Sequence, residues 1–406
     1  MENKKSIAFF LTNIFIVLIF IRPQEIFPFL EPFKLAKITM ILAIITAIGE
    51  KTINKATLKE KCFVYLLLMQ ILSVLLIPFS LWGANSVEFF VNSYIKMFIT
   101  FTLIILLTNT RKRFNTLLNT VYACTVISAI RIIMAYKNNL VIWDQGVKRV
   151  VGIEVLSSSD PNDVAIIFTM ILPFSFYFIS KQKNLFFKAM HITFLVVIIS
   201  AIIVTGSRGG YLGTMIALLS YFFIVNKRKI FNFLFATFVF FVLIISFMPE
   251  NYMNRFTSMF DKSDYNYEEG GRLEIWKRSL KTIVISPQGV GINNFQVAEG
   301  QRKTEAGLSG KWQVAHNSYL QVVVELGIIG FIFYLLFLKA AYVNVFQIMK
   351  SNVKLASVFF ASLNAFVVSS MFLSQAFCWI IYALISLITG LKIIESSERQ
   401  LHEPIQ

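Results

Sequence analysis

The sequence predicts an all-α polytopic membrane protein with about twelve transmembrane helices (10–12) and one large loop outside the membrane. Of its 406 residues, 56% are hydrophobic and only 15% are charged, a composition outside the range of soluble globular domains. Apolar runs also follow one another along most of the chain. Many approach the roughly 20 helical residues needed to cross a hydrocarbon core about 30 Å thick. These two observations exclude a soluble fold.

Twelve apolar runs are candidate transmembrane helices. The first follows Lys4 and Lys5 and resembles a signal peptide, but no small-residue cleavage site follows it, so a retained helix is expected. Tight junctions around Gly206 and Gln375 leave ten or eleven helices as alternatives. The predicted ranges are 6–21, 34–49, 62–82, 94–109, 115–135, 162–180, 189–205, 209–226, 230–248, 316–338, 354–374 and 376–394.

Lysine and arginine occur in every second connection between these helices. The formal charge of +16 is therefore distributed in short clusters, which is typical of membrane topology and not of nucleic-acid binding. The third connection, 82–92, carries no lysine or arginine, whereas Lys339, Lys350 and Lys354 fall in the tenth. The positive-inside rule then predicts that both termini are cytoplasmic.

Four parts follow from this topology. Transmembrane helices 1–9 occupy residues 1–248, and a large periplasmic loop with short helices occupies 249–315. Helices 10–12 occupy 316–394, and residues 395–406 form a cytoplasmic tail. The three cysteines, which match no metal-binding spacing, are expected to be buried core residues.

A glycine-rich turn around Arg208 is the first candidate ligand site. It lies between two apolar helices, where Gly206 and Gly209 allow backbone amides to approach a ligand. Ser207 precedes the next helix, whose positive N-terminal end attracts anions. This pattern favours a phosphate site. The alternative is a tight turn whose arginine extends to lipid headgroups.

Arg272 begins a predicted helix in the large loop. Leu273, Trp276 and Leu280 recur at helical spacing and predict one apolar stripe. The guanidinium of Arg272 suits the oxygens of a diphosphate, although an exposed surface charge would fit the spacing equally well. The nearby Arg278 is expected in solvent or among headgroups.

His316 is the histidine expected near the outer face, where a new apolar helix begins. Asn317 or Ser318 is a plausible cap for this helix. The helix dipole at that point favours a neutral imidazole, the form that can accept a proton from a hydroxyl group. The alternative is a hydrogen-bonded histidine with a structural role.

Two acidic residues are further candidates. Glu325 lies one predicted helical segment beyond His316, about 14 Å deeper at 1.5 Å per residue. A carboxylate inside the membrane is either functional or paired, here with Lys96 or Arg131. Asp160, in an Asp-Pro-Asn-Asp run, predicts a turn and a helix start with an outward-facing carboxylate.

Taken together, these motifs resemble the O-antigen ligase and O-antigen polymerase superfamily of bacterial membrane glycosyltransferases. The resemblance is firmest over residues 160–330 and depends on the order and spacing of the motifs. They are Arg-Pro-Gln-Glu (22–25), Asp-Pro-Asn-Asp (160–163), Gly-Ser-Arg-Gly-Gly (206–210), Gly-Arg-x-x-x-Trp (271–276), Gly-Val-Gly-x-x-Asn-Phe (289–295), Ala-His-Asn-Ser-Tyr-Leu (315–320) and Glu-Leu-Gly-Ile-Ile-Gly (325–330).

The resemblance implies a metal-independent transfer without a cofactor, on the outer face of the bacterial inner membrane. By this resemblance, Arg208 and Arg272 bind the diphosphate of an undecaprenyl-diphosphate-linked glycan donor. His316 orients or deprotonates the acceptor hydroxyl. Members of the family use a glycan, lipid A core or protein as acceptor, in O-antigen, lipopolysaccharide or exopolysaccharide biosynthesis. The supporting candidates are Ser207, Gly209, Asn317, Glu325 and Asp160.

A second class of function uses the same residues differently. A transporter or flippase of a lipid-linked sugar or small anion would also need outward-facing arginines. It would further require polar groups along a path through the bilayer, and Glu325, Lys96 and Arg131 are few for that purpose. The sequence therefore favours the glycosyltransferase hypothesis.

Overall fold

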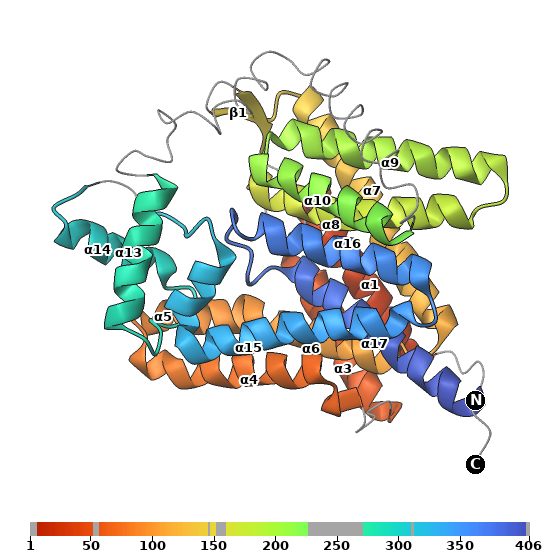
Figure 1. The fold of residues 1–406 in the computed structure, drawn as a ribbon, viewed down its shortest axis with the longest axis horizontal. Helices are drawn as coiled ribbons and strands as arrows, with labels where there is room; N and C mark the ends of the chain where they lie inside the picture. Colours follow the sequence, from red (N-terminus) through yellow and green to blue (C-terminus); the bar gives the residue numbers. More distant parts are fainter. Residues whose placement is uncertain are drawn as a thin grey trace.

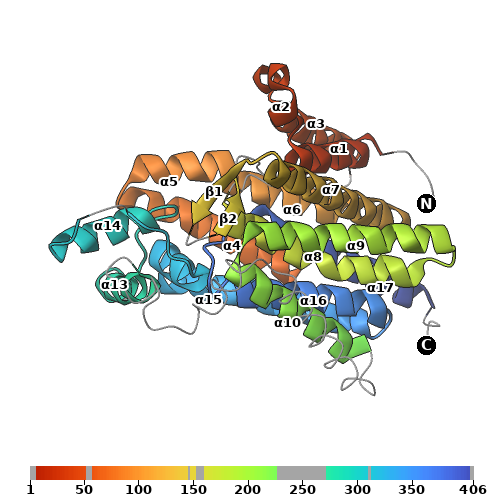
Figure 2. The same cartoon turned by 90° about the horizontal axis from the view of Figure 1, so that it is seen from above.

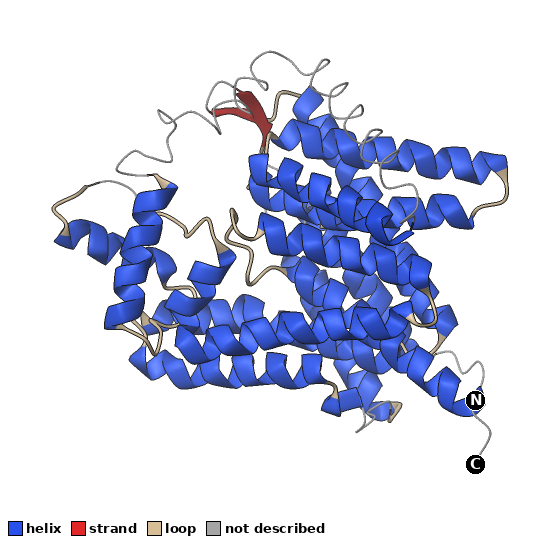
Figure 3. Ribbon diagram, in the orientation of Figure 1, coloured by secondary structure: helices blue, strands red, loops and turns tan. Residues whose placement is uncertain are grey.

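The computed structural model describes residues 6–51, 57–144, 147–151, 160–225, 271–309 and 312–402. Within these ranges α-helices dominate, and the strand pairing is a single two-stranded hairpin, which confirms the helical class (Figures 1 and 3). Nine described helices are long and apolar enough to cross a membrane. The predicted helix at 230–248 and residues 249–270 of the predicted loop lie outside the described residues.

Every predicted transmembrane range inside the described residues overlaps a helix. The elements are α1 (Ile7–Ile21), α2 (Pro23–Ile26), η1 (Pro28–Phe33), α3 (Leu35–Gly49), η2 (Thr57–Lys59), α4 (Lys61–Leu76), η3 (Ile77–Phe79), α5 (Gly83–Phe89), η4 (Phe90–Tyr94), α6 (Ile95–Leu107), α7 (Arg111–Lys137), β1 (Val141–Asp144), β2 (Val147–Val150), α8 (Pro161–Lys181), α9 (Leu185–Thr205), α10 (Arg208–Val225), α13 (Arg272–Ile285), α14 (Phe295–Glu305), α15 (Ser318–Met349), α16 (Val353–Ser369) and α17 (Trp379–His402).

One end of the bundle holds the start of α1 and the end of α17. Glu50, after α3, accepts hydrogen bonds from the Ser6 hydroxyl at 2.5 Å and from the Ala8 amide at 3.1 Å. Arg111, at the start of α7, forms an ion pair with Glu395 of α17 at 3.0 Å. The first and last described helices therefore have their outer ends at the same end of the bundle (Figure 1).

The opposite end gathers the starts of α8, α10, α15 and α17. The Ser318 amide of α15 donates to the Ser370 carbonyl after α16 at 2.8 Å. Arg149 of β2 donates to the Thr205 carbonyl at the end of α9 at 2.9 Å. Helices α13 and α14 also lie at this end, on the left in Figure 1. This end carries the predicted site residues.

Two predicted loop assignments are wrong. Residues 83–107 are helical, with a π-helical turn at η4, so most of the predicted third connection lies in a helix. The cause is tertiary: Asn85 and Ser86 donate to the carbonyls of Asn293 (2.6 Å) and Ile292 (2.8 Å), so this polar run is a helix packed on a loop. Lys339 lies inside α15, not in a connection.

Helix α15 is interrupted where it leaves this end of the bundle. Gly327 has φ 69° and ψ −174°, which is not helical. Residues 328–349 alone extend about 33 Å at 1.5 Å per residue, enough to cross a hydrocarbon core of about 30 Å. The segment before Gly327 is therefore not needed to reach the length of a bilayer crossing.

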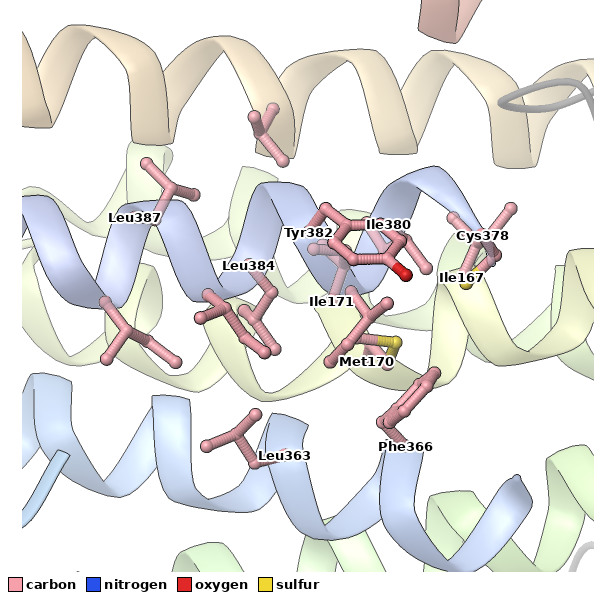
Figure 4. Packing of buried hydrophobic residues seen from close by; sticks show 14 of the residues in the cluster. Ile167, Met170, Ile171, Leu363, Phe366, Cys378, Ile380, Tyr382, Leu384 and Leu387 are labelled. Atoms are coloured by element: carbon pink, nitrogen blue, oxygen red, sulfur yellow. The ribbon is translucent and has the colours of Figure 1, made fainter. Parts of the chain in front are cut away.

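The hydrophobic core extends through most of the bundle, and Figure 4 shows the part where residues of α8, α16 and α17 pack together. Met170, Phe366 and Tyr382 are each at most 1% exposed in it. The three cysteines are free and buried, which confirms their prediction as core residues. A packed core of this kind fixes the starts of α10 and α15, and thereby the site, relative to each other.

Candidate functional site

His316 lies in a short turn that is held from both sides. Its own amide donates to the Ser374 hydroxyl at 2.8 Å. The preceding carbonyl, of Ala315, accepts from the Trp276 indole at 3.0 Å. His316 has φ 47°, in the left-handed region that residues other than glycine seldom adopt. These two hydrogen bonds hold a strained backbone in place, as occurs at functional sites.

The start of α15 continues this arrangement. The Asn317 side chain accepts from the Tyr319 amide at 2.9 Å and caps the helix, as predicted. The Ser318 hydroxyl donates to the Leu373 carbonyl at 2.6 Å and accepts from the Gln375 amide at 2.8 Å. The connection between α16 and α17 is therefore attached to the residue pair that follows His316.

The charges of Arg272 and Asp160 both act on the titration of His316. Burial lowers the pKa of His316 to about 4, and the positive charge of Arg272 acts in the same direction. The carboxylate of Asp160 opposes both effects. The imidazole is thus neutral near pH 7, as predicted, although the main cause is burial and not the helix dipole.

Arg272 is the first residue of α13, and the predicted apolar stripe of this helix does not coincide with its packed face. Leu273 and Leu280 are 38% and 57% exposed, whereas Ile275 is fully buried. Trp276 turns toward the chain before His316 because its indole has a carbonyl to bind there. The packed face of α13 therefore combines Ile275 and Trp276 with polar residues, which apolar spacing alone does not reveal.

Arg278, expected in solvent, is buried. Its guanidinium binds one carboxylate oxygen of Glu299 in α14, at 2.7 Å from Nη2 and 3.1 Å from Nε. The other oxygen of Glu299 accepts from the Gln313 amide at 3.1 Å. This buried pair joins α13 and α14 to the segment that leads into His316.

Arg208 is the first residue of α10. The Ser207 hydroxyl accepts from the Gly210 amide at 3.2 Å, an N-cap contact that sets where the helix begins. A Cβ atom at Gly210 would lie 2.7 Å from the Cβ of Ala165 in α8, closer than real carbon atoms approach. The missing side chain thus allows the start of α10 to lie against α8.

The neighbouring Gly209 contacts the support of the histidine. Its carbonyl accepts from the Ser369 hydroxyl at 3.1 Å, and a Cβ atom there would lie 3.6 Å from Leu373. Leu373 is also the residue bound by Ser318. Arg208 and His316 are therefore both attached to the connection between α16 and α17.

Arg149 braces the turn that precedes Arg208. It is 4% exposed, and its three nitrogens donate to the Thr205 carbonyl at 2.9 Å and to the side chains of Asp144 and Asn162 at 2.8 Å each. Gly206 has φ 61°, and a Cβ atom there would lie 3.3 Å from the Arg149 side chain. Arg149 joins the hairpin, α8 and α9 into one support.

Asp160 caps α8. One carboxylate oxygen accepts from the Asn162 amide at 2.7 Å, as the Asp-Pro-Asn-Asp pattern predicts. The residue is exposed, yet its charge acts on His316. A capping carboxylate can therefore serve here as the negative group that the imidazole faces.

Glu325 has partners other than the predicted ones. It is 1% exposed, and its two carboxylate oxygens accept from the amides of Asn293 at 2.8 Å and Phe295 at 3.3 Å. The expected pairing with Arg131 is wrong because Arg131 pairs with Glu25 at 3.0 Å. In the described parts of the chain, no ion pair joins Glu325 to Lys96 either. The carboxylate fixes a loop of main chain.

That loop, residues 287–295, enters the break in α15. The Gly291 amide donates to the Glu325 carbonyl at 3.0 Å. Gly289 and Gly327 have φ angles of 98° and 69°, and a Cβ atom on Gly289 would lie 2.5 Å from the Gly327 nitrogen. Two glycine motifs distant in sequence are thus the two halves of one backbone junction.

Sequence reasoning did not find several residues that hold the site. Ser374 binds the His316 amide, and Ser318 binds the same connection. The only signal was the tight junction near Gln375, which separates two apolar runs without indicating what it contacts. Hydroxyl groups that bind backbone atoms carry no periodicity, so pattern analysis does not identify them.

Comparison with known proteins agrees with the site region. Residues 193–335 match the family model Wzy_C, described as O-antigen ligase. The fold and this match define a polytopic membrane protein with an O-antigen ligase domain, which contains Arg208, Arg272 and His316. Over this part of the chain the protein is similar to the O-antigen ligase family.

Two further comparisons add no functional argument. A search of curated proteins found no match. One similar solved structure was reported under "Structural coordination of polymerization and crosslinking by a peptidoglycan synthase complex". It aligns over 83% of this chain and 97% of that chain, with 13% identity and a TM-score of 0.47. At that TM-score the similarity supports no conclusion about activity.

Proposed function

We propose that this protein is a metal-independent membrane glycosyltransferase that transfers or polymerises undecaprenyl-diphosphate-linked oligosaccharide in bacterial cell-surface polysaccharide biosynthesis. The observation that carries the proposal is the turn at His316. There a neutral imidazole lies within the electrostatic reach of Arg272 and is attached to the same connection as the helix of Arg208.

Each residue has one role in the proposed transfer. Arg208 and Arg272 bind the diphosphate of the donor. The acceptor oxygen attacks the anomeric carbon while the bond from that carbon to the diphosphate oxygen breaks. Undecaprenyl diphosphate leaves with the bonding electron pair, and the two guanidinium groups stabilise its charge. The proton of the acceptor hydroxyl passes to neutral His316.

Donor binding would itself improve the base. With a pKa of about 4, the imidazole alone has little affinity for a proton at neutral pH. A bound diphosphate adds negative charge near it and offsets Arg272, which raises the pKa of His316 toward neutrality. The histidine then becomes a stronger base only when a donor is present.

The supporting residues act by position. Ser207 and Gly209 seat Arg208 on α10, and Asn317 caps the helix after the histidine. Asp160 raises the pKa of His316, against the effect of Arg272. Glu325 binds the main chain of the 287–295 loop. None of these five needs to touch the reacting atoms.

Transfer by purified full-length protein in lipid nanodiscs tests the proposal. The donor is the undecaprenyl-diphosphate-linked repeat unit of the host. Arg208→Ala, Arg272→Ala and His316→Ala should each abolish product, whereas Lys277→Ala, an exposed cation of α13, should not. Normal product from all three variants would overturn the assignment. Activity that EDTA abolishes and a divalent cation restores would overturn metal independence.

The product distinguishes the reaction classes. A ladder of lengthened lipid-linked chains without added acceptor indicates a polymerase, and transfer of one chain to lipid A core or protein indicates a ligase. Movement of the lipid-linked sugar across sealed vesicles without a new glycosidic bond would replace the transferase with the flippase alternative.

We also propose that the His316 end faces the periplasm and that both termini are cytoplasmic. Because the three native cysteines are buried, a cysteine introduced at exposed Lys277 should react with a membrane-impermeant maleimide added to spheroplasts. A cysteine at exposed Lys183, in the connection after α8, should react only after lysis. The reverse labelling pattern would invert the topology.

A further inference from the structure

A cavity lies outside the site described above. Its volume is about 460 Å³, and it lies among α1, η1, α3, η4 and the start of α17. Figure 2 shows α1, α2 and α3 along one edge of the bundle. Four cationic side chains and one acidic side chain line it: Arg22, Lys34, Lys37, Lys96 and Glu31.

Among the described residues, three of these cations have no ion-pair partner. Arg22 pairs with Glu25. For Lys34, Lys37 and Lys96, no salt bridge is found within the part of the chain that the structure describes. Lys37 lies close enough to Lys96 for their charges to repel each other. An anion between them would convert this repulsion into attraction.

The backbone around the cavity is also unusual. Arg22 and Lys34 have φ angles of 48° and 44°, left-handed conformations that cost energy in residues with a side chain. They lie on either side of α2 and η1, and so fold the chain over the cavity. Gln24, of the Arg-Pro-Gln-Glu motif, lines it too. The first motif of the chain therefore has a structural context separate from His316.

The other walls are apolar. Phe15 and Leu18 of α1, Met40 of α3 and Trp379 line the cavity beside the cations. On α3, Ile38 and Ile45 are 50% and 59% exposed, as expected for a helix that faces lipid. A ligand with an anionic head and a hydrocarbon tail would contact both the cationic and the apolar side chains that line the cavity.

The cavity is at the same end of the bundle as His316. Arg131 of α7 donates to the Ile21 carbonyl at the end of α1. Helix α7 then continues to the hairpin whose Arg149 binds Thr205, beside the turn of Arg208. The cavity and the candidate site are therefore at the same end of the bundle, joined through α7 and the hairpin.

We propose that this cavity binds the phosphate group of an anionic lipid, as a second phosphate site separate from Arg208 and Arg272. Lys37 and Lys96 contact the phosphate, Lys34 adds charge at the entrance, and the α1 and α3 side chains contact the hydrocarbon. The phosphate belongs either to an isoprenoid diphosphate or to a phospholipid of the surrounding bilayer.

Binding to full-length protein in phosphatidylcholine nanodiscs tests this. The probes are farnesyl diphosphate, phosphatidylglycerol and inorganic pyrophosphate, and native mass spectrometry counts the bound molecules. Lys37→Gln/Lys96→Gln should weaken lipid binding at least about tenfold, since a hydrogen bond to a charged group is worth about 1.5–3 kcal/mol. Lys37→Arg/Lys96→Arg should retain binding.

Two controls separate this site from others. Lys183→Gln/Lys188→Gln removes the same charge from exposed positions at the opposite end of the bundle and should change nothing. Arg208→Ala/Arg272→Ala should leave this binding intact, even if the proposed transferase function is wrong. Stronger binding of farnesyl diphosphate than of phosphatidylglycerol identifies an isoprenoid diphosphate as the source, and the reverse identifies a phospholipid.

Three outcomes would overturn the proposal. The first is unchanged lipid binding in Lys37→Gln/Lys96→Gln. The second is equal loss in the Lys183→Gln/Lys188→Gln control. The third is pyrophosphate binding as tight as that of farnesyl diphosphate, because the apolar walls would then contribute nothing.

Discussion

The charge of Arg272 should shift the titration of His316. Replacing Arg272 with Gln removes a positive charge that disfavours the imidazolium ion, so the pKa of His316 should rise. Replacing Asp160 with Asn removes the opposing negative charge, so the pKa should fall below its value of about 4. Asparagine also caps helices well, so α8 should keep its start.

The size of the effect follows from the same values. The difference between an ordinary pKa of 6.5 and about 4 corresponds to about 3 kcal/mol of preference for the neutral form. Burial is the largest cause and remains in the variant. A neighbouring like charge contributes roughly 1 pH unit, or about 1.4 kcal/mol, so Arg272→Gln should titrate near pH 5.

Stability should change with the same sign. Between its folded pKa of about 4 and the unfolded value of 6.5, His316 binds a proton more readily in the unfolded chain. The protein should therefore lose stability as pH falls through this window, by up to about 3 kcal/mol. Arg272→Gln should reduce that loss by about 1.4 kcal/mol.

Carbon-13 NMR of labelled histidine measures the pKa directly. The chain has three histidines, so a His191→Asn/His402→Asn background leaves His316 alone. Lys277→Gln, which removes an exposed charge from the same helix as Arg272, is the matched control and should leave the titration unchanged. A pKa that stays the same or falls in Arg272→Gln would refute the electrostatic link between these two residues.

Three further substitutions test the supports. Gly210→Ala places a carbon 2.7 Å from Ala165 and should lower stability by about 1–3 kcal/mol. Gly209→Ala places a carbon at ordinary contact distance and should not lower stability in this way. Equal melting temperatures of the Gly210→Ala and Gly209→Ala variants would contradict the packing argument. Trp276→Phe removes an indole donor and should lower folding stability by about 1 kcal/mol. Its effect on the activation free energy of transfer should be larger. Thermal melting and transfer kinetics would measure the two effects. Glu325→Gln replaces one accepting oxygen with an NH₂ group, which then lies against a backbone N–H donor. It should lower the free energy of unfolding by about 1–3 kcal/mol in denaturation measurements.

The helices were largely predictable because hydrocarbon imposes a simple rule. An apolar run that crosses the bilayer must form a helix, so the ends of the run predict the ends of the helix within a few residues. The rule fails where protein replaces lipid or water. The polar run from Gly83 to Phe89 is helical because Asn85 and Ser86 bind loop carbonyls, and no local pattern encodes that contact.

The site was predictable in its parts but not in its assembly. Asp160 and Asn317 carry capping signals that depend on neighbouring residues only, and both caps are observed. The approach of Arg272 to His316 depends on Trp276, which the apolar pattern assigned to a different face. Ser374 enters from a third element without any sequence signal. Local chemistry is visible in the chain, whereas contacts between distant segments follow from packing.

The motifs that suggested the family divide accordingly into two kinds. The segments around Gly289 and Glu325 fit each other, since the loop enters the break at Gly327 and the carboxylate binds its amides. Their spacing is explained by backbone fit without any ligand. The charge of Arg272, in contrast, disfavours the imidazolium form of His316, so a proton that His316 accepts is bound there at an electrostatic cost. A bound anion between the two residues would reduce that cost. The surroundings of Arg272 and His316 are therefore where a substrate should be sought.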